Sequence, residues 1–406
     1  MDTHPVIVIG GGISGLALAW HAARAGQAPL VLEASPRLGG CLDSRRGPDG
    51  YWFELGAHTL YNSYGALLEV ALGCPTPPAI VARGDARKRF GLLRGGALTT
   101  MGPLSVFRQF GAWELLTSVP RAPFRKKPAQ PTVREHFGRL VGARNYAAVL
   151  APFLSAVPSQ AVDDFPATGP GSLFKKRPRR KDITKSFTFD GGVGAIAAAI
   201  TGAGVTTRVD APVAAITRRD RGYQVRLADG SELAAARLAV ATDPATAARL
   251  LADAHPAVAT AVGAIRTVTV DSLGVVVDRA AVTLPALAFV VPTDDVFWSV
   301  VTRDPVPDER HRAFTFHFKP GLDADARRRR VAEVLGVGAD RWLTVEERRT
   351  TLPAPGRDHA AAVAAIDAAL VGLPLAVAGN YFAGLAIEDC AARARDEWAR
   401  LDAPPG

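Results

Sequence analysis

Apolar runs and a glycine-rich turn at the start of the chain predict a strand, a helix and a second strand. The run Val6–Ile9 enters the turn Gly10-Gly11-Gly12-Ile13-Ser14-Gly15, and a second run, Leu30–Leu32, ends in Glu33. Between the two runs a helical stretch extends from Ser14 to Arg24. Together they form a βαβ unit of the dinucleotide-binding type.

Each glycine of this turn has a physical reason in such a unit. Gly10 allows the strand to turn tightly, Gly12 leaves the backbone open to a pyrophosphate, and Gly15 lets the helix pack closely on the strand. The phosphates then lie at the helix N-terminus, and Glu33 accepts hydrogen bonds from the ribose hydroxyls. The alternative is a glycine-rich turn that binds nothing.

Further elements follow after the first sixty residues. We expect a strand at Ser186–Phe189, a turn at Gly191-Gly192, a helix at Val193–Thr201, one strand at Val205–Ile216, an alternating strand at Tyr223–Leu227, a tight turn at Asp229-Gly230 and a buried strand at Leu238–Thr242. Helices are expected between 132 and 156 and at Asp323–Leu335. Strands are expected at Ser272–Val277, Leu287–Val291, Phe297–Val301 and Ala313–Phe318, and a last strand and helix between Leu373 and Leu401.

The segment after Glu33 identifies the dinucleotide. Glu33-Ala34-Ser35-Pro36-Arg37-Leu38-Gly39-Gly40 resembles the extended FAD signature of the amine oxidase, phytoene desaturase and protoporphyrinogen oxidase superfamily. The resemblance implies that Gly39 and Gly40 lie against the diphosphate and that Arg37 flanks the adenosine. The family usually has arginine after the glycine pair, where this chain has Cys41, and Arg45 or Arg46 is a candidate for the missing charge.

The C-terminal segment resembles the final FAD motif of protoporphyrinogen oxidases. An apolar strand ends in Gly379-Asn380, and Gly384-Leu385-Ala386 precedes the pair Asp389-Cys390, which amine oxidases and carotene desaturases usually lack. A helix that starts near Leu385 would direct its positive N-terminal end toward the flavin and stabilise the charge of the reduced ring. Glu388 and Asp389 are interpreted as ordinary helix-start carboxylates.

The same resemblance places further residues beside the cofactor. Gly56, Ala57, His58 and Thr59 are expected to pass the isoalloxazine end, Val213 to contact the adenine through its backbone, and Ile13, Ser14, Ala34 and Ala241 to complete the cofactor site. His58 is the one candidate catalytic residue, with a structural hydrogen-bonding role as the alternative.

Composition indicates a globular protein of two interleaved domains. The chain has 406 residues, of which 48% are hydrophobic and 21% charged. Three cysteines without CxxC spacing argue against a disulfide framework or a zinc site, and the histidines form no HxxH or HExxH pair, so we expect no metal. Met1–Pro5 is too short for a signal peptide, and no apolar run is long enough to span a bilayer.

The net charge of +9 is unevenly distributed along the chain. A basic run surrounds Pro178 and consists of Lys175, Lys176, Arg177, Arg179, Arg180 and Lys181. Such a run attracts anionic lipid, an acidic substrate or nucleic acid, and the alternative is a solvated loop. No nucleic-acid-binding signature accompanies the run, so we set nucleic acid aside.

These patterns predict an α/β fold. A Rossmann-like, GR2-type FAD-binding domain would comprise residues 1–75, 186–255 and 351–406, and an inserted mixed α+β substrate domain would comprise 76–185 and 256–350. The expected location is cytoplasmic, with peripheral contact at the inner face of the membrane through the basic run.

The expected function is FAD-dependent oxidation of the protoporphyrinogen oxidase type. Hydride would pass from a hydrophobic cyclic small molecule to flavin N5, and electrons would then pass to oxygen or a quinone. No acid or base is needed if ring N–H protons leave to water. Alternatives are a tailoring oxidase or desaturase of secondary metabolism, a redox-neutral flavin mutase and a flavoprotein without turnover.

Overall fold

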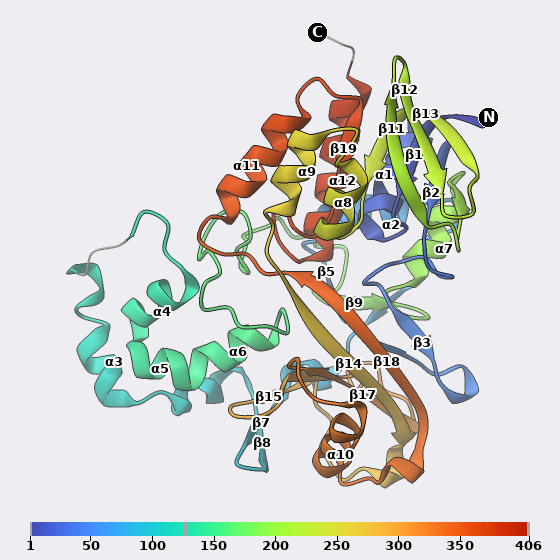
Figure 1. The fold of residues 1–406 in the computed structure, drawn as a ribbon. Coiled ribbons are helices and arrows are strands. Elements are labelled where there is room, and N and C mark those ends of the chain that lie inside the picture. The colour runs from blue at the N-terminus through green and yellow to red at the C-terminus, as the bar shows by residue number, and fades with distance from the viewer. Residues whose placement is uncertain (1, 125–127, 404–406) are drawn as a thin grey trace.

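A mainly parallel sheet carries the N-terminal βαβ unit (Figure 1). The structure, a computed structural model, describes residues 2–124 and 128–403. The strand order is β10-β2-β1-β13-β12-β11, with β19 also paired to β13. The strands are β1 (Asp2–Ile9), β2 (Pro29–Leu32), β10 (Thr206–Arg208), β11 (Val213–Arg219), β12 (Gly222–Leu227), β13 (Glu232–Val240) and β19 (Leu375–Val377). Here β1 pairs in parallel with both β2 and β13, whereas β11, β12 and β13 form an antiparallel meander.

Helices cover this sheet on both faces. Neighbouring residues of β1 therefore belong to different hydrophobic cores. Val6 and Val8 pack under one group of helices, α1 (Ile13–Arg24), α2 (Gly65–Gly73), α7 (Ala195–Thr201) and α12 (Ile387–Asp402). Ile7 and Ile9 pack under the other, α8 (Pro244–Leu251), α9 (Pro256–Gly263) and α11 (His359–Leu370). An unbroken apolar strand is the pattern expected of a strand buried on both sides. The predicted α/β fold is confirmed.

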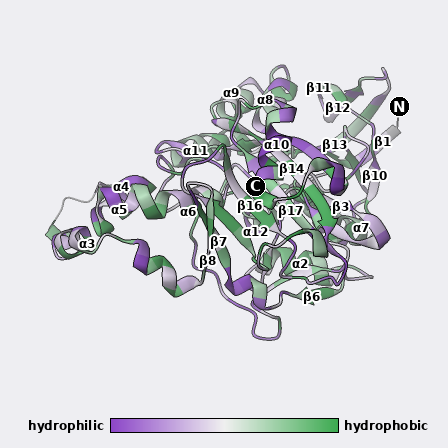
Figure 2. Cartoon of the chain, turned by 90° about the horizontal axis from the view of Figure 1, so that it is seen from below, coloured by the Kyte–Doolittle hydropathy of each residue, from purple (hydrophilic) through white to green (hydrophobic). Residues whose placement is uncertain are grey.

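A second sheet lies below the first in Figure 1 and has the order β18-β14-β17-β16-β15-β7-β8. Its strands are β7 (Phe90–Arg94), β8 (Ala97–Met101), β14 (Thr267–Asp278), β15 (Phe289–Pro292), β16 (Phe297–Thr302), β17 (His311–Phe318) and β18 (Trp342–Pro353). Alternate residues of β14 face opposite ways, so that Leu273, Val275 and Val277 pack toward α10 (Ala324–Leu335). Figure 2 shows hydrophobic residues along these strands and a hydrophilic α10.

The other face of the second sheet packs on a segment that begins just after the glycine pair. This segment contains the hairpin β3 (Ser44–Arg46) and β4 (Trp52–Glu54). Tyr51, Phe53 and Leu55 form a small core with Val276 and Ala313. A Cβ added to Gly274 would lie 2.6 Å from the Phe53 ring, so a glycine at this position allows the close approach. A third sheet follows this segment in the chain. It has three strands in the order β5 (Leu60–Tyr61), β9 (Ser186–Phe189) and β6 (Ile80–Ala82).

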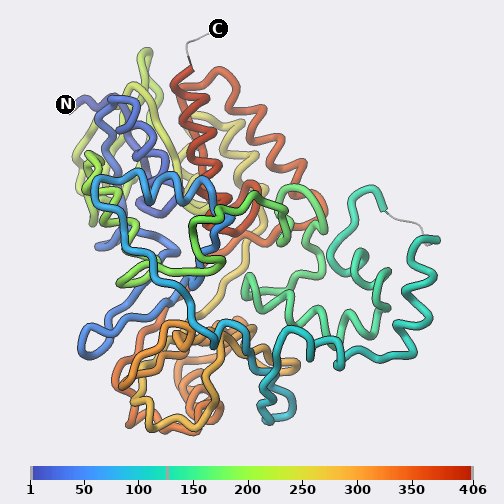
Figure 3. The backbone as a smooth tube through the Cα atoms, turned by 180° about the vertical axis from the view of Figure 1, so that it is seen from behind, coloured from blue at the N-terminus to red at the C-terminus, as the bar shows by residue number. Residues whose placement is uncertain are grey.

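A helical lobe projects to one side of both sheets, as Figure 3 shows from behind. It contains α3 (Ala112–Ser118), α4 (Val133–Val141), α5 (Ala143–Asn145), a π-helical turn (Tyr146–Leu150) and α6 (Ala151–Ala156). Its own core is small and contains Val133, Tyr146, Val162 and Phe165. The helices expected between 132 and 156 are therefore present.

Several sequence-based expectations need correction. The single strand expected at Val205–Ile216 is two strands, β10 and β11, because Asp210 has a φ of 50° and Pro212 follows it. The hairpin β7–β8 and the long strand β18 were missed. β7 and β8 come from the first predicted substrate segment, and β18 continues past residue 350. The division into domains at the predicted boundaries remains a prediction.

A buried carboxylate joins the second sheet to the segment after the glycine pair. Asp43, 1% exposed, binds Arg37 at 3.0 Å, Arg45 at 2.7 Å and Arg348 of β18 at 2.8 Å. Three guanidinium groups surround this one carboxylate, and the negative charge of Asp43 offsets the repulsion among them.

We therefore expect Asp43→Asn to lower the free energy of unfolding by about 3 kcal/mol, since it removes the buried carboxylate that Arg37, Arg45 and Arg348 share and leaves only Glu346, 3.5 Å from Arg45, as a nearby anion. Urea unfolding followed by circular dichroism measures this loss. Asp182→Asn is the matched control, because Asp182 forms an exposed, solvent-screened pair with Arg180 and its loss should leave the stability almost unchanged. Equal losses in the two variants would contradict the assignment.

Candidate active site

The first glycine turn has the shape that a dinucleotide requires. Gly10 has a φ of 107° and donates its N–H to the Leu32 carbonyl at 2.8 Å. A Cβ on Gly10 would lie 2.6 Å from the Ala241 carbonyl oxygen, and one on Gly15 would collide with the Gly10 oxygen. At Gly12, by contrast, the nearest atom is the Gly40 Cα at 3.7 Å. Packing within the protein therefore requires glycine at 10 and 15, whereas Gly12 borders open space suited to a ligand.

The second glycine pair lies directly against the first turn. The Gly39 N–H donates to the Gly11 carbonyl at 2.8 Å, and Gly12 and Gly39 form an isolated parallel bridge. Gly39 and Gly40 both have positive φ, and a Cβ on Gly40 would lie 2.9 Å from the Gly12 Cα. Two glycine turns thus form one cradle at the N-terminus of α1, and the residues present fit a diphosphate.

Polar side chains fix the rim of this cradle. Glu33 accepts from the Gly11 N–H at 2.7 Å and from the Ser35 N–H and hydroxyl at 2.9 and 2.7 Å. Arg37 donates to the carbonyls of Leu38 and Gly40 at 3.1 and 2.7 Å. Both side chains hold the turn in shape before any ligand arrives. The ribose contact of Glu33, the adenosine contact of Arg37 and any contact of Ala34 remain predictions.

The charge beside Cys41 comes from a distant strand. Arg45 binds Asp43, and Arg46 lies near Gly191, with a guanidinium nitrogen 3.2 Å from a Cβ added there. Burial raises the pKa of the Cys41 thiol, and the strongest opposing charge is that of Arg348. Arg348 is more than three hundred residues away along the chain, so no local motif around Cys41 indicates it.

The remaining predicted cofactor residues lie around the same cradle. Ile13 and Ser14 open α1 and are buried, and Ala241 donates its N–H to Ile9 at 2.7 Å. Val213 is the buried first residue of β11. Its neighbour Ala211 donates to the Glu33 carbonyl at 2.9 Å, so this strand lies beside the Glu33 rim.

The C-terminal motif connects the start of α12 to the basic run. Gly379 and Asn380 follow β19, and a Cβ on Gly379 would collide with the Tyr381 ring. Leu385 packs against the core of the helical lobe, and Ala386 is the N-cap of α12, which begins at Ile387 rather than near Leu385. A Cβ on Gly384 would lie 3.2 Å from the Lys175 ammonium.

The two carboxylates in the first turn of α12 have specific partners elsewhere, which corrects the expectation of ordinary helix-start residues. Glu388 accepts from the backbone N–H groups of Ala66 and Leu67, both at 3.0 Å, and so caps α2. Asp389 pairs with Lys175 at 3.0 Å and with Arg177 at 2.8 Å. Two charges of the basic run are therefore used inside the protein.

His58 belongs to a hydrogen-bonded chain that the sequence did not reveal. Its Nε2 lies 3.0 Å from Nε2 of His317 on β17, and His317 Nδ1 lies 2.9 Å from the hydroxyl of Ser272 on β14. Burial, His317 and Arg83 hold the pKa of His58 well below its usual range, and burial lowers the pKa of His317 to about 4. Both imidazoles are therefore neutral at physiological pH.

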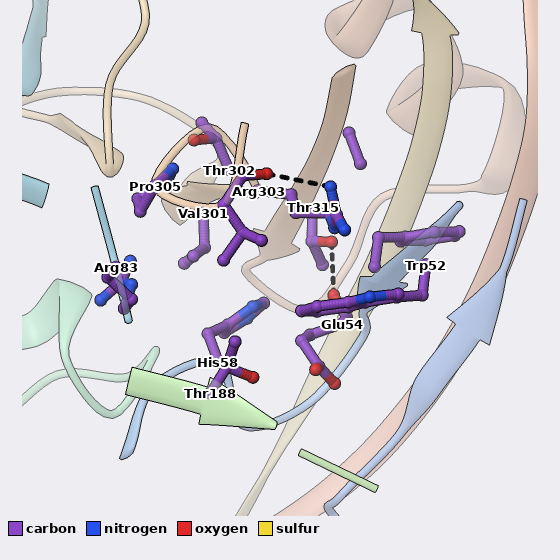
Figure 4. A pocket seen from close by; sticks show the side chains of 13 residues that line it. Trp52, Glu54, His58, Arg83, Thr188, Val301, Thr302, Arg303, Pro305 and Thr315 are labelled. Atoms are coloured by element: carbon purple, nitrogen blue, oxygen red, sulfur yellow. Dashed lines mark hydrogen bonds between the residues drawn. The ribbon is translucent and has the colours of Figure 1, made fainter. Parts of the chain in front are cut away.

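A pocket opens beside His58 (Figure 4). It lies between the second sheet and the segment from Cys41 to Thr59, which follows the glycine pair and is called the cofactor segment below. It is narrow, because the space within it that a water-sized sphere can reach is about 20 Å³. Arg83 donates to the Thr59 hydroxyl at 2.7 Å, and Arg303 stacks over the Trp52 ring at 4.2 Å. Burial raises the pKa of Glu54, also in the pocket wall, to about 7. The pocket is thus lined by two guanidinium groups and one partly neutralised carboxyl group.

The family follows from the cradle and from sequence comparison. The profile of the flavin containing amine oxidoreductase family matches residues 13–321. The chain belongs to this family. It is therefore an FAD-dependent oxidoreductase. Among the described residues no group of three or more His, Cys, Asp or Glu side chains is arranged to hold a metal ion.

Sequence relatives match only part of the chain. Human protoporphyrinogen oxidase is 46% identical over 103 residues, which are 23% of this chain and 21% of the relative. An Arabidopsis thaliana 15-cis-phytoene desaturase is 41% identical over 59 residues, 14% of this chain and 10% of the relative. The match thus spans about a fifth of the length of the first of these relatives.

Solved structures share the fold over nearly the whole chain. A "Putative protoporphyrinogen oxidase" from Exiguobacterium has a TM-score of 0.78 at 19% identity and covers 98% of both chains. Cyclohexylamine oxidase from Brevibacterium oxydans has a TM-score of 0.72 at 16% identity, again with 98% of both chains covered. At these identities the likeness shows the predicted Rossmann-like FAD-binding fold.

The cradle geometry separates two glycine substitutions. Gly12→Ala should fold normally but lose most of its FAD, because the added methyl group fits the protein and occupies the space for the diphosphate. Gly15→Ala should destabilise the apoprotein itself, since its methyl group collides with the Gly10 carbonyl. Bound FAD is measured by absorbance and apoprotein stability by thermal unfolding. Full FAD occupancy in Gly12→Ala would refute the cradle.

Proposed function

We propose that this protein is an oxidase of the protoporphyrinogen oxidase type, which removes hydride from a hydrophobic cyclic substrate. The observation that carries the proposal is the 46% identity to human protoporphyrinogen oxidase over 103 residues. Protoporphyrinogen is the first candidate substrate. Oxygen or a quinone is the proposed acceptor of the electrons.

The charge of the pocket supports an anionic rather than a cationic substrate. Arg83 and Arg303 line it, and Glu54 is the one carboxyl group among its lining residues. Since the Glu54 pKa is raised to about 7, the pocket is positive at neutral pH. A protonated amine would be repelled there, whereas a carboxylate side chain of a porphyrinogen would be attracted.

The residues around the cradle define what the protein contributes to the reaction. FAD, when bound, supplies the hydride acceptor. Gly12, Gly39 and Gly40 are proposed to receive its diphosphate, and Glu33 its ribose. The N-terminus of α12, which follows Gly384, is proposed to stabilise the negative charge of reduction. The protein thus binds and orients both partners.

A tailoring oxidase or desaturase of secondary metabolism is the second candidate. The 41% identity to phytoene desaturase over 59 residues favours it, because that relative acts on a different class of molecule. Both candidates predict substrate-dependent reduction of the flavin. A redox-neutral mutase or a non-catalytic flavoprotein would instead leave oxidised flavin unchanged by any of these substrates.

Anaerobic mixing of the FAD-loaded protein with candidate substrates tests the proposal. Protoporphyrinogen should bleach the flavin within the first turnover, and air or a quinone should restore its absorbance. Putrescine and cyclohexylamine serve as cationic comparisons and should leave the flavin oxidised. If a polyene or phenolic precursor reduces the flavin and porphyrinogens do not, the tailoring-oxidase candidate replaces the first one.

Peripheral membrane contact is also proposed, through fewer residues of the basic run than the sequence indicated and through additional apolar side chains. In the basic run Lys175 and Arg177 pair with Asp389 and Arg180 with Asp182, which leaves the exposed side chains Lys176, Arg179 and Lys181 for lipid. The helical lobe and the turn that precedes it, Pro103–Gln109, add exposed apolar side chains: Leu104, Phe107, Trp113, Leu116, Val119 and Phe124, with Trp113 79% exposed. No helix in the described part of the chain is long and apolar enough to cross a membrane.

Vesicles that contain phosphatidylserine separate the two contributions. Replacing Lys176, Arg179 and Lys181 by glutamine should remove the salt-dependent part of binding, about 1 kcal/mol per charge. Replacing Phe107, Trp113 and Leu116 by serine should remove the salt-independent part. Sedimentation at low and high salt measures both. Unchanged sedimentation of both variants would exclude this membrane contact.

A further inference from the structure

One polar row crosses the second sheet and points at the cofactor segment. Ser272 on β14 is the cross-strand partner of His317 on β17 and of Arg348 on β18. Directly opposed residues of neighbouring strands lie on the same face of a sheet. Arg348 reaches Asp43, and His317 reaches His58. The row therefore contacts the cofactor segment at two points, both within eighteen residues of Gly40.

The contact between the two imidazoles has a defined proton capacity. Two Nε2 atoms 3.0 Å apart can share only one proton between them. In the neutral pair one ring donates and the other accepts. If the pair takes up one more proton, the N–H···N bond persists, and the Ser272 hydroxyl 2.9 Å away accepts from His317 Nδ1. A second extra proton would place two N–H groups face to face, so uptake stops at one.

The surroundings keep this pair neutral only while the site carries no negative charge. Arg83 faces His58 and opposes protonation, and burial opposes the protonation of both rings. Glu54 and Arg303 are the other charged groups of the same pocket, and Glu54 already binds Ser44 and the Val193 N–H at 2.7 and 2.8 Å. A negative charge that develops nearby would favour the protonated pair.

We propose that the chain Ser272–His317–His58 takes up one proton when the cofactor is reduced. His58 lies two residues beyond Gly56, which packs directly on the Cys41 carbonyl next to the cradle. The charge brought by hydride is then balanced by a proton on the protein. His58 touches the pocket and is the proton acceptor, whereas His317 and Ser272 act through it as positioning residues.

The proposal extends the proposed function by defining its substrate class. The substrate loses a hydride from C–H, with two electrons, and a proton from a conjugated N–H or O–H, and a new π bond forms between the two positions. FAD, when bound, would supply the hydride acceptor, and His58 would take the proton. A ring N–H proton therefore leaves to this chain rather than directly to water.

Spectroelectrochemical titration of the FAD-loaded protein tests the uptake without any substrate. Each proton taken up with two electrons changes the midpoint potential by about 30 mV per pH unit, because tenfold in an equilibrium constant is about 30 mV for a two-electron couple. Between the low pKa of the pair in the oxidised protein and its raised pKa in the reduced protein, we expect the slope of the parent to exceed that of His58→Gln and His317→Gln by about 30 mV per pH unit. Glutamine keeps hydrogen-bonding capacity and cannot take the proton.

Two further variants separate positioning from folding. Ser272→Ala removes the acceptor for His317 Nδ1–H, so the steep slope should end at a lower pH, and Ser272→Thr should restore it. His255→Gln is the matched control, since His255 is also buried, bonds the Tyr223 hydroxyl at 2.9 Å and lies outside the pocket. It should keep the parent slope.

Equal slopes in the parent and both glutamine variants, at full FAD occupancy, would overturn the proposal. The result is independent of the substrate assignment. If the slopes differ and porphyrinogens still fail to reduce the flavin, the proton uptake stands and the protoporphyrinogen oxidase assignment falls. If porphyrinogens reduce the flavin and the slopes are equal, the opposite holds.

Discussion

The arrangement of the active site depends on one short segment held between two sheets. The carboxylate of Asp43 is almost fully buried and binds three guanidinium groups, one of which, Arg348, belongs to the second sheet. Such a cluster is stable only when every member is present, because an unpaired buried charge is costly. Since Asp43 lies three residues after Gly40, the same contact that joins the sheets also fixes the end of the cradle.

This dependence gives the second sheet a role beyond lining the pocket beside His58. Its face toward the cofactor segment is apolar where it meets Phe53 and Leu55 and polar where it meets Asp43 and His58. The apolar part supplies the burial free energy, and the polar part fixes the register. A shift of β14 by one residue would move Ser272 to the other face and break the link to His317.

The parts of the fold that the sequence predicted correctly are those whose signal is local. The run Val6–Ile9 is apolar because both faces of β1 are buried, and the following turn needs glycine at positions 10 and 15. β18 was missed because it carries no run of buried apolar residues: Leu343 and Val345 are exposed, and Arg349 pairs with Asp271 on β14. Its strand character comes from its partner strand, and a single sequence does not show which strands pair.

In the candidate site, too, the parts with a local sequence signal were predicted and the parts that depend on distant residues were not. The cradle lies within forty residues and has a motif, whereas the pocket brings together residues from four distant segments. His58 and His317 are 259 positions apart, and neither has a neighbour in sequence that indicates the other. The second sheet brings His317 to His58, and the register between β14 and β17 places Ser272 opposite His317. A lone histidine therefore becomes part of a hydrogen-bonded chain only through the sheet that packs against it, and the charge of Arg348 acts on Cys41 through the same packing.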